Sequence, residues 1–261
     1  MADARRRHPE SEAWLGLLDA ALGESEDGAT WGAAVPRPPA DRPVKAPLLY
    51  RARFTVDERA AGRWVKRLAA RANVGDVDAV ALLEAGVRQD NPDPPALRVV
   101  AQLAAIPLLQ ACARVLAADV PASWWEGYCP VCGAWPVLAE YVGLERKRQL
   151  RCGRCGTGWA IPMLRCAFCD ETDHERLGYL APDGDEEVRK VEVCNTCKGY
   201  VKALTTVRSL APWAILLDDL TTVHLDVVAI ERGYERPERP GYALDAQVVE
   251  EGGGGQGWWR L

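Results

Sequence analysis

The residues best suited to chemistry in this chain are its cysteines. Eight of the nine form four Cys-x-x-Cys pairs, namely Cys129/Cys132, Cys152/Cys155, Cys166/Cys169 and Cys194/Cys197. A small secreted scaffold scatters its cysteines for disulfides, whereas tight pairs in an intracellular chain indicate metal ligands. Four thiolate sulfurs suit a tetrahedral Zn²⁺ or iron ion. The sequence therefore predicts two ions, Zn or Fe, each bound by four cysteines.

The sequence between the pairs indicates which pairs share an ion. The first two form Cys-x2-Cys-x19-Cys-x2-Cys and the last two form Cys-x2-Cys-x24-Cys-x2-Cys, both close to zinc-ribbon spacing. Each interval reads as strand, turn and strand: 136–142, 143–147 and 148–151 in the first, 177–180, 182–185 and 188–193 in the second. This repeated unit predicts closure in sequence order. The alternative is an interleaved arrangement, first pair with third and second with fourth.

The residue after the second cysteine of each pair bears on the geometry of the loop. Gly133 and Gly156 permit a positive φ there, which lets backbone N–H groups point at sulfur. Asp170 and Lys198 occupy the same place in the other two pairs. Aspartate tolerates the left-handed region fairly well and lysine less comfortably. The first two loops therefore match rubredoxin and zinc-ribbon knuckles more closely than the last two.

Other uses of these residues are weaker. Redox Cys-x-x-Cys chemistry needs a thioredoxin-like strand–helix frame, and a catalytic zinc keeps an open position and a mixed ligand set. His174 reads as a solvated side chain, His224 has no evident partner, and Cys112 reads as a small buried hydrophobe. The chain shows no nucleophile–base pair, P-loop or dinucleotide motif. We therefore predict a protein that is not an enzyme.

Composition narrows the class of protein further. The chain has 261 residues, of which 48% are hydrophobic, and a net charge of −5, so no global basic field attracts nucleic acid or acidic membranes. It has no run of eighteen apolar residues, which predicts no membrane insertion. Glu10, Glu12 and Asp19 interrupt the apolar part of the first 23 residues, which argues against a secretion signal. These features predict a cytoplasmic protein.

Periodicity and breaker residues divide the chain into segments of an α+β protein. An N-terminal helical bundle should precede two tandem rubredoxin-like or zinc-ribbon modules and a C-terminal helix. Residues 1–47 contain a helix over 10–22 and a Pro/Gly-rich loop over 23–47. Residues 48–120 form a helical domain with helices at 57–72, 76–89 and 96–117. They are followed by the domain with two four-cysteine metal sites over 121–210, a C-terminal helix over 211–235 and a flexible tail over 236–261 that carries Trp258 and Trp259.

The order of these features resembles a known family. The segments that carry the likeness are Cys129-Pro130-Val131-Cys132-Gly133, Arg151-Cys152 with Trp159, Arg165-Cys166-Ala167-Phe168-Cys169, Glu192-Val193-Cys194-Asn195-Thr196-Cys197 with Tyr200 and Lys202, Asp218-Asp219-Leu220 and Gly233-Tyr234. Over about residues 121–235 the chain resembles the formate dehydrogenase accessory protein FdhE family. The Pro-rich segment before residue 47 and the Gly-rich end depart from that pattern.

The resemblance implies a cytoplasmic factor that binds the catalytic subunit of a molybdenum- or tungsten-dependent formate dehydrogenase and is needed for its activity. It implies the eight paired cysteines as metal ligands and no catalytic residue. A client segment would bind between the helical bundle and the metal module. Trp124 and Trp125 at this junction read first as core residues; if exposed, they would serve as binding anchors. A homodimer is left open.

Two other functions compete with this one. Zinc ribbons commonly bind nucleic acid through a basic, aromatic face, but residues 127–210 carry 12 Lys/Arg against 11 Asp/Glu. The cluster Arg146-Lys147-Arg148 reads as a solvated hairpin tip. Rubredoxin-like electron transfer would require iron and is not distinguished by the sequence. The acidic chain and the resemblance together favour the accessory protein without nucleic acid.

Overall fold

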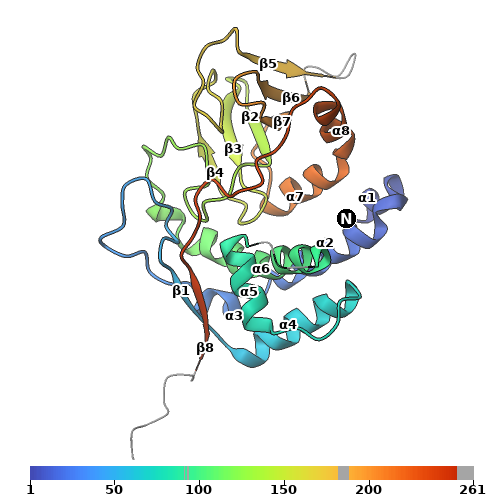
Figure 1. Ribbon diagram of the computed structural model, residues 1–261, viewed down its shortest axis with the longest axis vertical. Coiled ribbons are helices and arrows are strands. Elements are labelled where there is room, and N and C mark those ends of the chain that lie inside the picture. The colour runs from blue at the N-terminus through green and yellow to red at the C-terminus, as the bar shows by residue number, and fades with distance from the viewer. Residues whose placement is uncertain (91, 93, 182–187, 252–261) are drawn as a thin grey trace, which may run out of the picture.

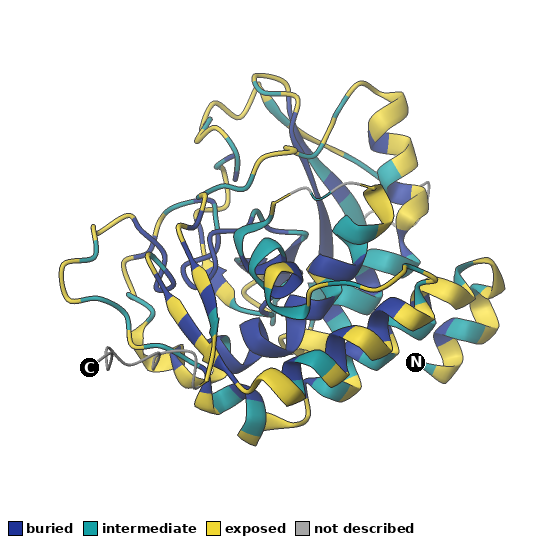
Figure 2. Ribbon diagram, turned by 60° about the horizontal axis from the view of Figure 1, so that its bottom comes forward, coloured by how far each residue is buried: buried dark blue, intermediate teal, exposed yellow. Residues whose placement is uncertain are grey.

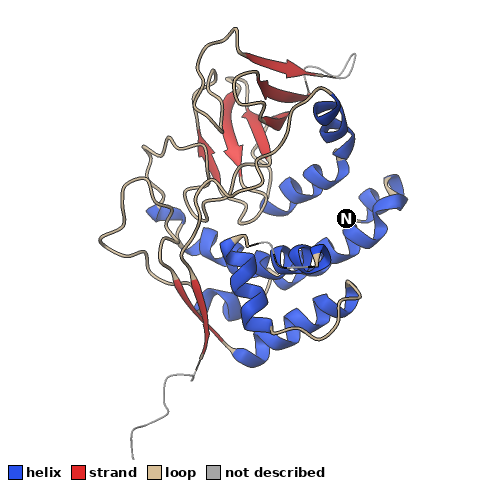
Figure 3. Ribbon diagram, in the orientation of Figure 1, coloured by secondary structure: helices blue, strands red, loops and turns tan. Residues whose placement is uncertain are grey.

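The computed structural model describes residues 1–90, 92, 94–181 and 188–251. Helices gather in one half of the molecule and a six-stranded sheet in the other (Figures 1 and 3). We call residues 1–120 the helical half and residues 121–235 the metal half. The predicted turn at 182–185, Asn91 of the predicted break after the second bundle helix, and the Gly-rich end with Trp258 and Trp259 lie outside the described residues. The mixed helix and sheet architecture confirms the predicted fold class.

Helical segments form most of the described part of the helical half. They are α1 (Ala2–Arg7), η1 (Pro9–Ser11), α2 (Glu12–Glu24), α3 (Gly28–Ala33), α4 (Glu58–Arg71), α5 (Ala79–Arg88) and α6 (Pro95–Val115), with a last turn η2 (Ala117–Asp119). Asp57 caps α4 by accepting from the Ala60 amide, and Asp78 caps α5 by accepting from the Val80 and Ala81 amides. Helix α3 lies within residues 23–47, so the prediction of a loop there is wrong for this part. Asp27 caps α3 by accepting a hydrogen bond from the Thr30 amide.

Helix α6 is the centre of the helical half. The Trp64 indole of α4 donates to the Ala104 carbonyl at 3.0 Å, and a Cβ on Gly86 of α5 would lie 2.0 Å from the Ala101 oxygen. Cys112 is fully buried in this core, as predicted. By length and composition alone α6 could cross a membrane, but most of it is buried inside the protein. Figure 2 shows buried residues on the inner sides of the helices and exposed residues on their outer sides.

The sheet contains both predicted hairpins. Its strands are β2 (Leu138–Val142), β3 (Lys147–Arg151), β4 (Gly158–Ala160), β5 (Leu177–Leu180), β6 (Arg189–Cys194) and β7 (Tyr200–Thr206), in the order β4-β3-β2-β7-β6-β5. Strand β7, which was not predicted, pairs parallel with β2 and antiparallel with β6. The two ribbon units therefore share one continuous sheet.

Two helices cover one face of this sheet (Figure 1). The single helix predicted over 211–235 is two helices, α7 (Pro212–Thr221) and α8 (Val223–Glu231). Leu225 and Ala229 of α8 pack on the side of β6 and β7. Lys202 of β7, only 1% exposed, lies 2.8 Å from both Asp219 and Asp226. This buried ion cluster ties the helices to the central strand, and Arg236 bonds the same two carboxylates.

The segment after α8 returns to the helical half. Trp135 donates to the Arg239 carbonyl at 3.0 Å, and the Tyr242 amide donates to Gly133. Strand β8 (Gln247–Glu250) then pairs parallel with β1 (Arg53–Val56). The flexible tail predicted from residue 236 is therefore wrong for residues 236–251, which join the two halves.

Candidate metal centres

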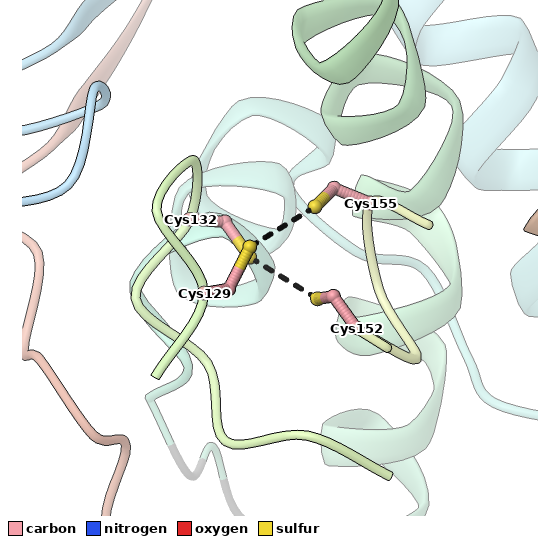
Figure 4. A group of neighbouring side chains, drawn as sticks. All are labelled: Cys129, Cys132, Cys152 and Cys155. Atoms are coloured by element: carbon pink, nitrogen blue, oxygen red, sulfur yellow. Dashed lines mark hydrogen bonds between the residues drawn. The ribbon is translucent and has the colours of Figure 1, made fainter. Parts of the chain in front are cut away.

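The structure brings the eight paired cysteines together in two groups of four. We call Cys129, Cys132, Cys152 and Cys155 the first centre (Figure 4), and Cys166, Cys169, Cys194 and Cys197 the second centre. Within each group all four sulfurs lie within 4.8 Å of one another. The pairs therefore close in the predicted sequence order, and the interleaved arrangement is not observed. In the described residues no histidine or carboxylate joins either group.

The distances between sulfurs fit a shared ion. Cys129 and Cys155 are 3.4 Å apart and Cys132 and Cys152 3.5 Å apart in the first centre. In the second centre the corresponding Sγ–Sγ distances are both 3.7 Å. A tetrahedral ion with Zn–S bonds of about 2.3 Å places its sulfurs about 3.8 Å apart. None of the cysteines forms a disulfide. Both groups are positioned to hold metal ions.

All four cysteine loops have the same backbone hydrogen bonds. In each, the first cysteine amide donates to the carbonyl five residues later, as Cys129 does to Ala134. The residue after the second cysteine donates back to the carbonyl of the first, as Gly133 does to Cys129. The same hydrogen-bonded cysteine loop, or knuckle, is therefore repeated at all four pairs. This regularity aims two sulfurs from each loop at a common point.

The left-handed backbone expected at Gly133 and Gly156 is present at all four knuckles. Gly133 has φ +72° and Gly156 has φ +78°, while Asp170 has φ +62° and Lys198 has φ +60°. The loops that lack glycine therefore adopt the same geometry at a cost in backbone strain. In three of the loops an amide also points at sulfur, at 3.4 Å from Cys152, Cys166 and Cys197. These bonds stabilise thiolate charge.

The first centre is buried where the two halves meet. All four of its cysteines are at most 1% exposed. The carbonyls of Pro130 and Val131 accept hydrogen bonds from the Leu48 and Leu49 amides of the helical half. The guanidinium of Arg154 donates to the Gly86 carbonyl at the end of α5. A metal here would hold both halves together.

The second centre lies near the surface. Cys169 is exposed and Cys197 is half-buried. Arg165 and Asp170 form an ion pair beside it at 2.8 Å, and the Phe168 ring packs edge-on against Trp135. This centre therefore differs from the first in its access to solvent, not in its ligand set.

Burial raises the pKa of several of these thiols, whereas hydrogen bonds to the sulfur lower the pKa of Cys152 and Cys194 despite burial. Burial raises the pKa of Cys129 well above its ordinary value. Burial also raises the pKa of Cys197, to about 11. Four neighbouring thiols cannot all ionise without a compensating cation, so metal binding must expel protons. A dication supplies that compensation.

The histidines and tryptophans considered in the sequence lie outside both centres. His174 is exposed with its ring 3.9 Å from Asp173, and His224 is exposed on α8. Trp124 is 6% exposed and belongs to the core, whereas Trp125 is 55% exposed. Sequence reasoning missed the Leu48 and Leu49 amides that support the first centre, because nothing in their local pattern signals a contact with a loop so far along the chain.

Two closed groups of four cysteines, on knuckles at the ends of hairpins, define a metal-binding protein of the zinc-ribbon or rubredoxin-like class. Comparison with known proteins identifies a family that part of the chain resembles. Residues 164–240, which include the whole second centre, match the FdhE C-terminal domain. Over this segment the chain is similar to proteins of the FdhE family.

Individual relatives show how far this likeness extends. The chain is 32% identical over 111 residues to Protein FdhE of Escherichia coli O127:H6, covering 42% of this chain and 35% of that protein. It is 36% identical over 110 residues to the Protein FdhE homolog of Pasteurella multocida, covering 41% of this chain and 35% of that protein. The alignments thus span about a third of these relatives.

A solved structure extends the likeness in fold. The crystal structure of the FdhE protein from Pseudomonas aeruginosa superposes with a TM-score of 0.52, covering 87% of this chain and 92% of that one at 22% identity. At this identity the match describes the fold alone. Because it covers 87% of the chain, it includes most of the helical half, which lies outside the FdhE C-terminal domain match.

Proposed function

We propose that this chain is a cytoplasmic accessory protein that binds the catalytic subunit of a molybdenum- or tungsten-dependent formate dehydrogenase and is needed for its activity. The observation that carries the proposal is the FdhE domain match over residues 164–240. That segment includes the second centre and the ion cluster around Lys202. The chain acts by binding and not by catalysis, since all eight paired cysteines are used in closed sites.

We further propose that the eight cysteines are metal ligands and that each group holds one Zn or Fe ion. The sulfur distances and the four matching knuckles support this. A dication in each group would neutralise thiolate charge and fix the loops. The residues themselves hold the geometry, through amides directed at sulfur and left-handed turns.

Rubredoxin-like electron transfer is a second candidate function, favoured by the exposure of Cys169. It requires iron at the second centre and predicts a coloured protein with a reversible redox wave. A colourless zinc protein would remove this candidate and leave the accessory role unaffected.

The test of the main proposal is deletion of the gene, with formate oxidation by cell extracts as the readout. Loss of activity that is restored by the wild-type gene and by Cys112→Ser, but not by Cys197→Ser, is the expected result. Cys112 is a suitable control because it is buried but belongs to neither centre. Normal formate oxidation in the deletion strain, with specific DNA retained by the purified protein, would instead support a nucleic-acid function.

A further inference from the structure

A groove runs between the helical half and the metal half. Two hollows of about 540 and 750 Å³ meet at Gln110, Arg114 and Pro212. The first hollow is bounded by the end of α6, by residues 120–124 and by residues 155–160 of the first ribbon. The second lies between α2, residues 25–28 and the start of α7. We call the two together the inter-half groove; Figure 1 shows α2 and α6 on one side and α7 on the other.

One wall of the first hollow is an edge of the sheet. Strand β4 lies at the end of the strand order and pairs only with β3 among the described strands. The Cys152 amide donates to the Thr157 carbonyl at 2.9 Å, and the Ile161 amide donates to the Arg148 carbonyl at 3.4 Å. Hydrogen-bonded positions alternate in an antiparallel pair. Trp159, midway between these bonds, is therefore the β4 residue whose backbone bonds β3.

Gly158 and Ala160 accordingly point their N–H and C=O groups away from β3. Neither forms a backbone or side-chain hydrogen bond with another described residue through these groups, and both are exposed. Such a free edge is a template for an added strand. Because both residues are small, their side chains do not block a chain that approaches this edge.

The opposite wall offers a buried amide without a described partner and an arginine without a described ion pair. Gln110 is 6% exposed, and within the described part of the chain its Nε2 has no hydrogen-bond partner. A buried amide left unpaired costs free energy that a ligand oxygen would recover. Among the residues that the structure describes, Arg114 is the one charged side chain around the first hollow. It forms no ion pair with a described residue, bonding only the Ser25 carbonyl at 3.3 Å.

We propose that the inter-half groove binds an extended segment of the partner polypeptide, which adds as a strand to β4. This rests on the proposed function, in which the partner is the formate dehydrogenase catalytic subunit. The segment pairs its backbone with Gly158 and Ala160, places apolar side chains against Trp124, and directs one carboxylate to Arg114. Gln110 binds a backbone carbonyl of the same segment.

The lining of the groove favours this occupant. The β4 edge borders the same hollow as Arg114 and Trp124, so an extended segment that pairs with β4 can also place an acidic and an apolar side chain on these residues. An unfolded segment of a newly made protein can enter. Cys155 and Gly156 line the same hollow, so binding depends on the first centre being intact.

The test uses the full-length protein and the catalytic subunit of formate dehydrogenase, co-expressed and captured through a tag. Ala160→Pro removes one outward-facing N–H from β4 while leaving the bonds to β3, a change tolerated on edge strands. The control is Tyr179→Pro on β5. The Asn195 amide bonds the Arg176 carbonyl there, so the Tyr179 N–H also faces outward, at the other edge of the sheet. We expect binding about tenfold weaker for Ala160→Pro and unchanged for Tyr179→Pro.

Amide hydrogen exchange on the wild-type complex tests the same proposal without a variant. The Gly158 and Ala160 amides should exchange more slowly when the catalytic subunit is bound. Equal binding by wild type and Ala160→Pro, or unprotected amides at these positions, would overturn the groove proposal. Weakening by Tyr179→Pro alone would also overturn it. If the wild type itself does not bind the catalytic subunit, the proposed function fails first.

Discussion

The first and second centres have the same set of four cysteines and the same knuckle in very different surroundings. At the first centre every cysteine is buried, and its loops bond Leu48 and Leu49 of the helical half. At the second centre Cys169 is exposed and the neighbouring side chains are charged. The same cysteine geometry can therefore serve two purposes. A metal at the first centre would join the two halves, whereas a metal at the second would fix an accessible surface.

The sharpest way to break this comparison is to remove one ligand from each centre. Cys132→Ser should lose one ion and destabilise both halves, because Cys132 is part of the main core; structural zinc contributes on the order of 10 kcal/mol. Cys197→Ser should also lose one ion but leave the helical half folded. Metal quantitation and amide hydrogen exchange across α4 and α6 report the two outcomes.

Cys112→Ser is the control, since it alters a buried thiol without altering a centre. It should retain two ions. If Cys132→Ser left the helical half as protected as in the wild type, the first centre would not join the halves.

Loop geometry at the first centre gives the next largest effect. Gly133→Ala places a Cβ 2.6 Å from the Tyr242 oxygen at φ +72°, so we expect a loss of about 3 kcal/mol from left-handed strain and overpacking. Gly143→Ala is a matched control, because its φ is +71° but nothing lies within 4 Å of the added atom. Urea unfolding should show the larger loss for Gly133→Ala. Equal losses would mean that the contact with Tyr242 carries no stability.

Metal affinity at the second centre should fall as pH falls. The pKa of Cys197 is raised to about 11, chiefly by burial, so its thiol is protonated at neutral pH and must release that proton when the ion binds. Each released proton makes the affinity about tenfold weaker per pH unit of acidification, about 1.4 kcal/mol. Cobalt titrations of Cys132→Ser between pH 6 and 8 isolate this centre. A metal affinity independent of pH would contradict a protonated Cys197 thiol at neutral pH.

The rate at which each centre loses its ion to a chelator also distinguishes the two centres. The exposed second centre should lose its ion to a chelator about tenfold faster than the first, equivalent to about 1.4 kcal/mol of activation free energy. Release should follow two phases of one ion each. The fast phase should vanish in Cys197→Ser and remain in Cys132→Ser. A single phase for both ions would remove the difference in access.

The smallest effect is expected at Lys198. Its φ of +60° costs about 1–2 kcal/mol for a residue with a Cβ, but glycine loses about 0.5–1 kcal/mol more in chain entropy. Lys198→Gly should therefore stabilise the second centre by less than about 1 kcal/mol. Thermal unfolding of the metal-bound protein measures this. Clear destabilisation would show that the Lys198 contact with the Tyr234 ring matters more than backbone strain.

Local signals in the sequence were sufficient for much of this structure. Short-range spacing and turn chemistry predict the four pairs, their order of closure and both hairpins. These features involve residues close together in the chain. The knuckle geometry was harder to judge at Lys198, where four sulfurs and the hairpin impose a backbone that lysine does not favour.

Long-range pairing was not predictable in the same way. Strand β7 pairs with β2, more than fifty residues earlier in the chain, and β8 pairs with β1 from opposite ends of the chain. Short strands of this kind carry no periodicity that names their partner. The break at Thr222 between α7 and α8 was also missed, because the apolar stripe continues through it.

Metal quantitation with X-ray absorption spectroscopy on anaerobically purified protein decides whether the two groups of cysteines are metal centres. We expect two ions per chain, each with four sulfur ligands, and one remaining ion in both Cys132→Ser and Cys197→Ser. Fewer than two ions in the wild type, oxygen or nitrogen ligands, or two ions retained in either variant would contradict this expectation.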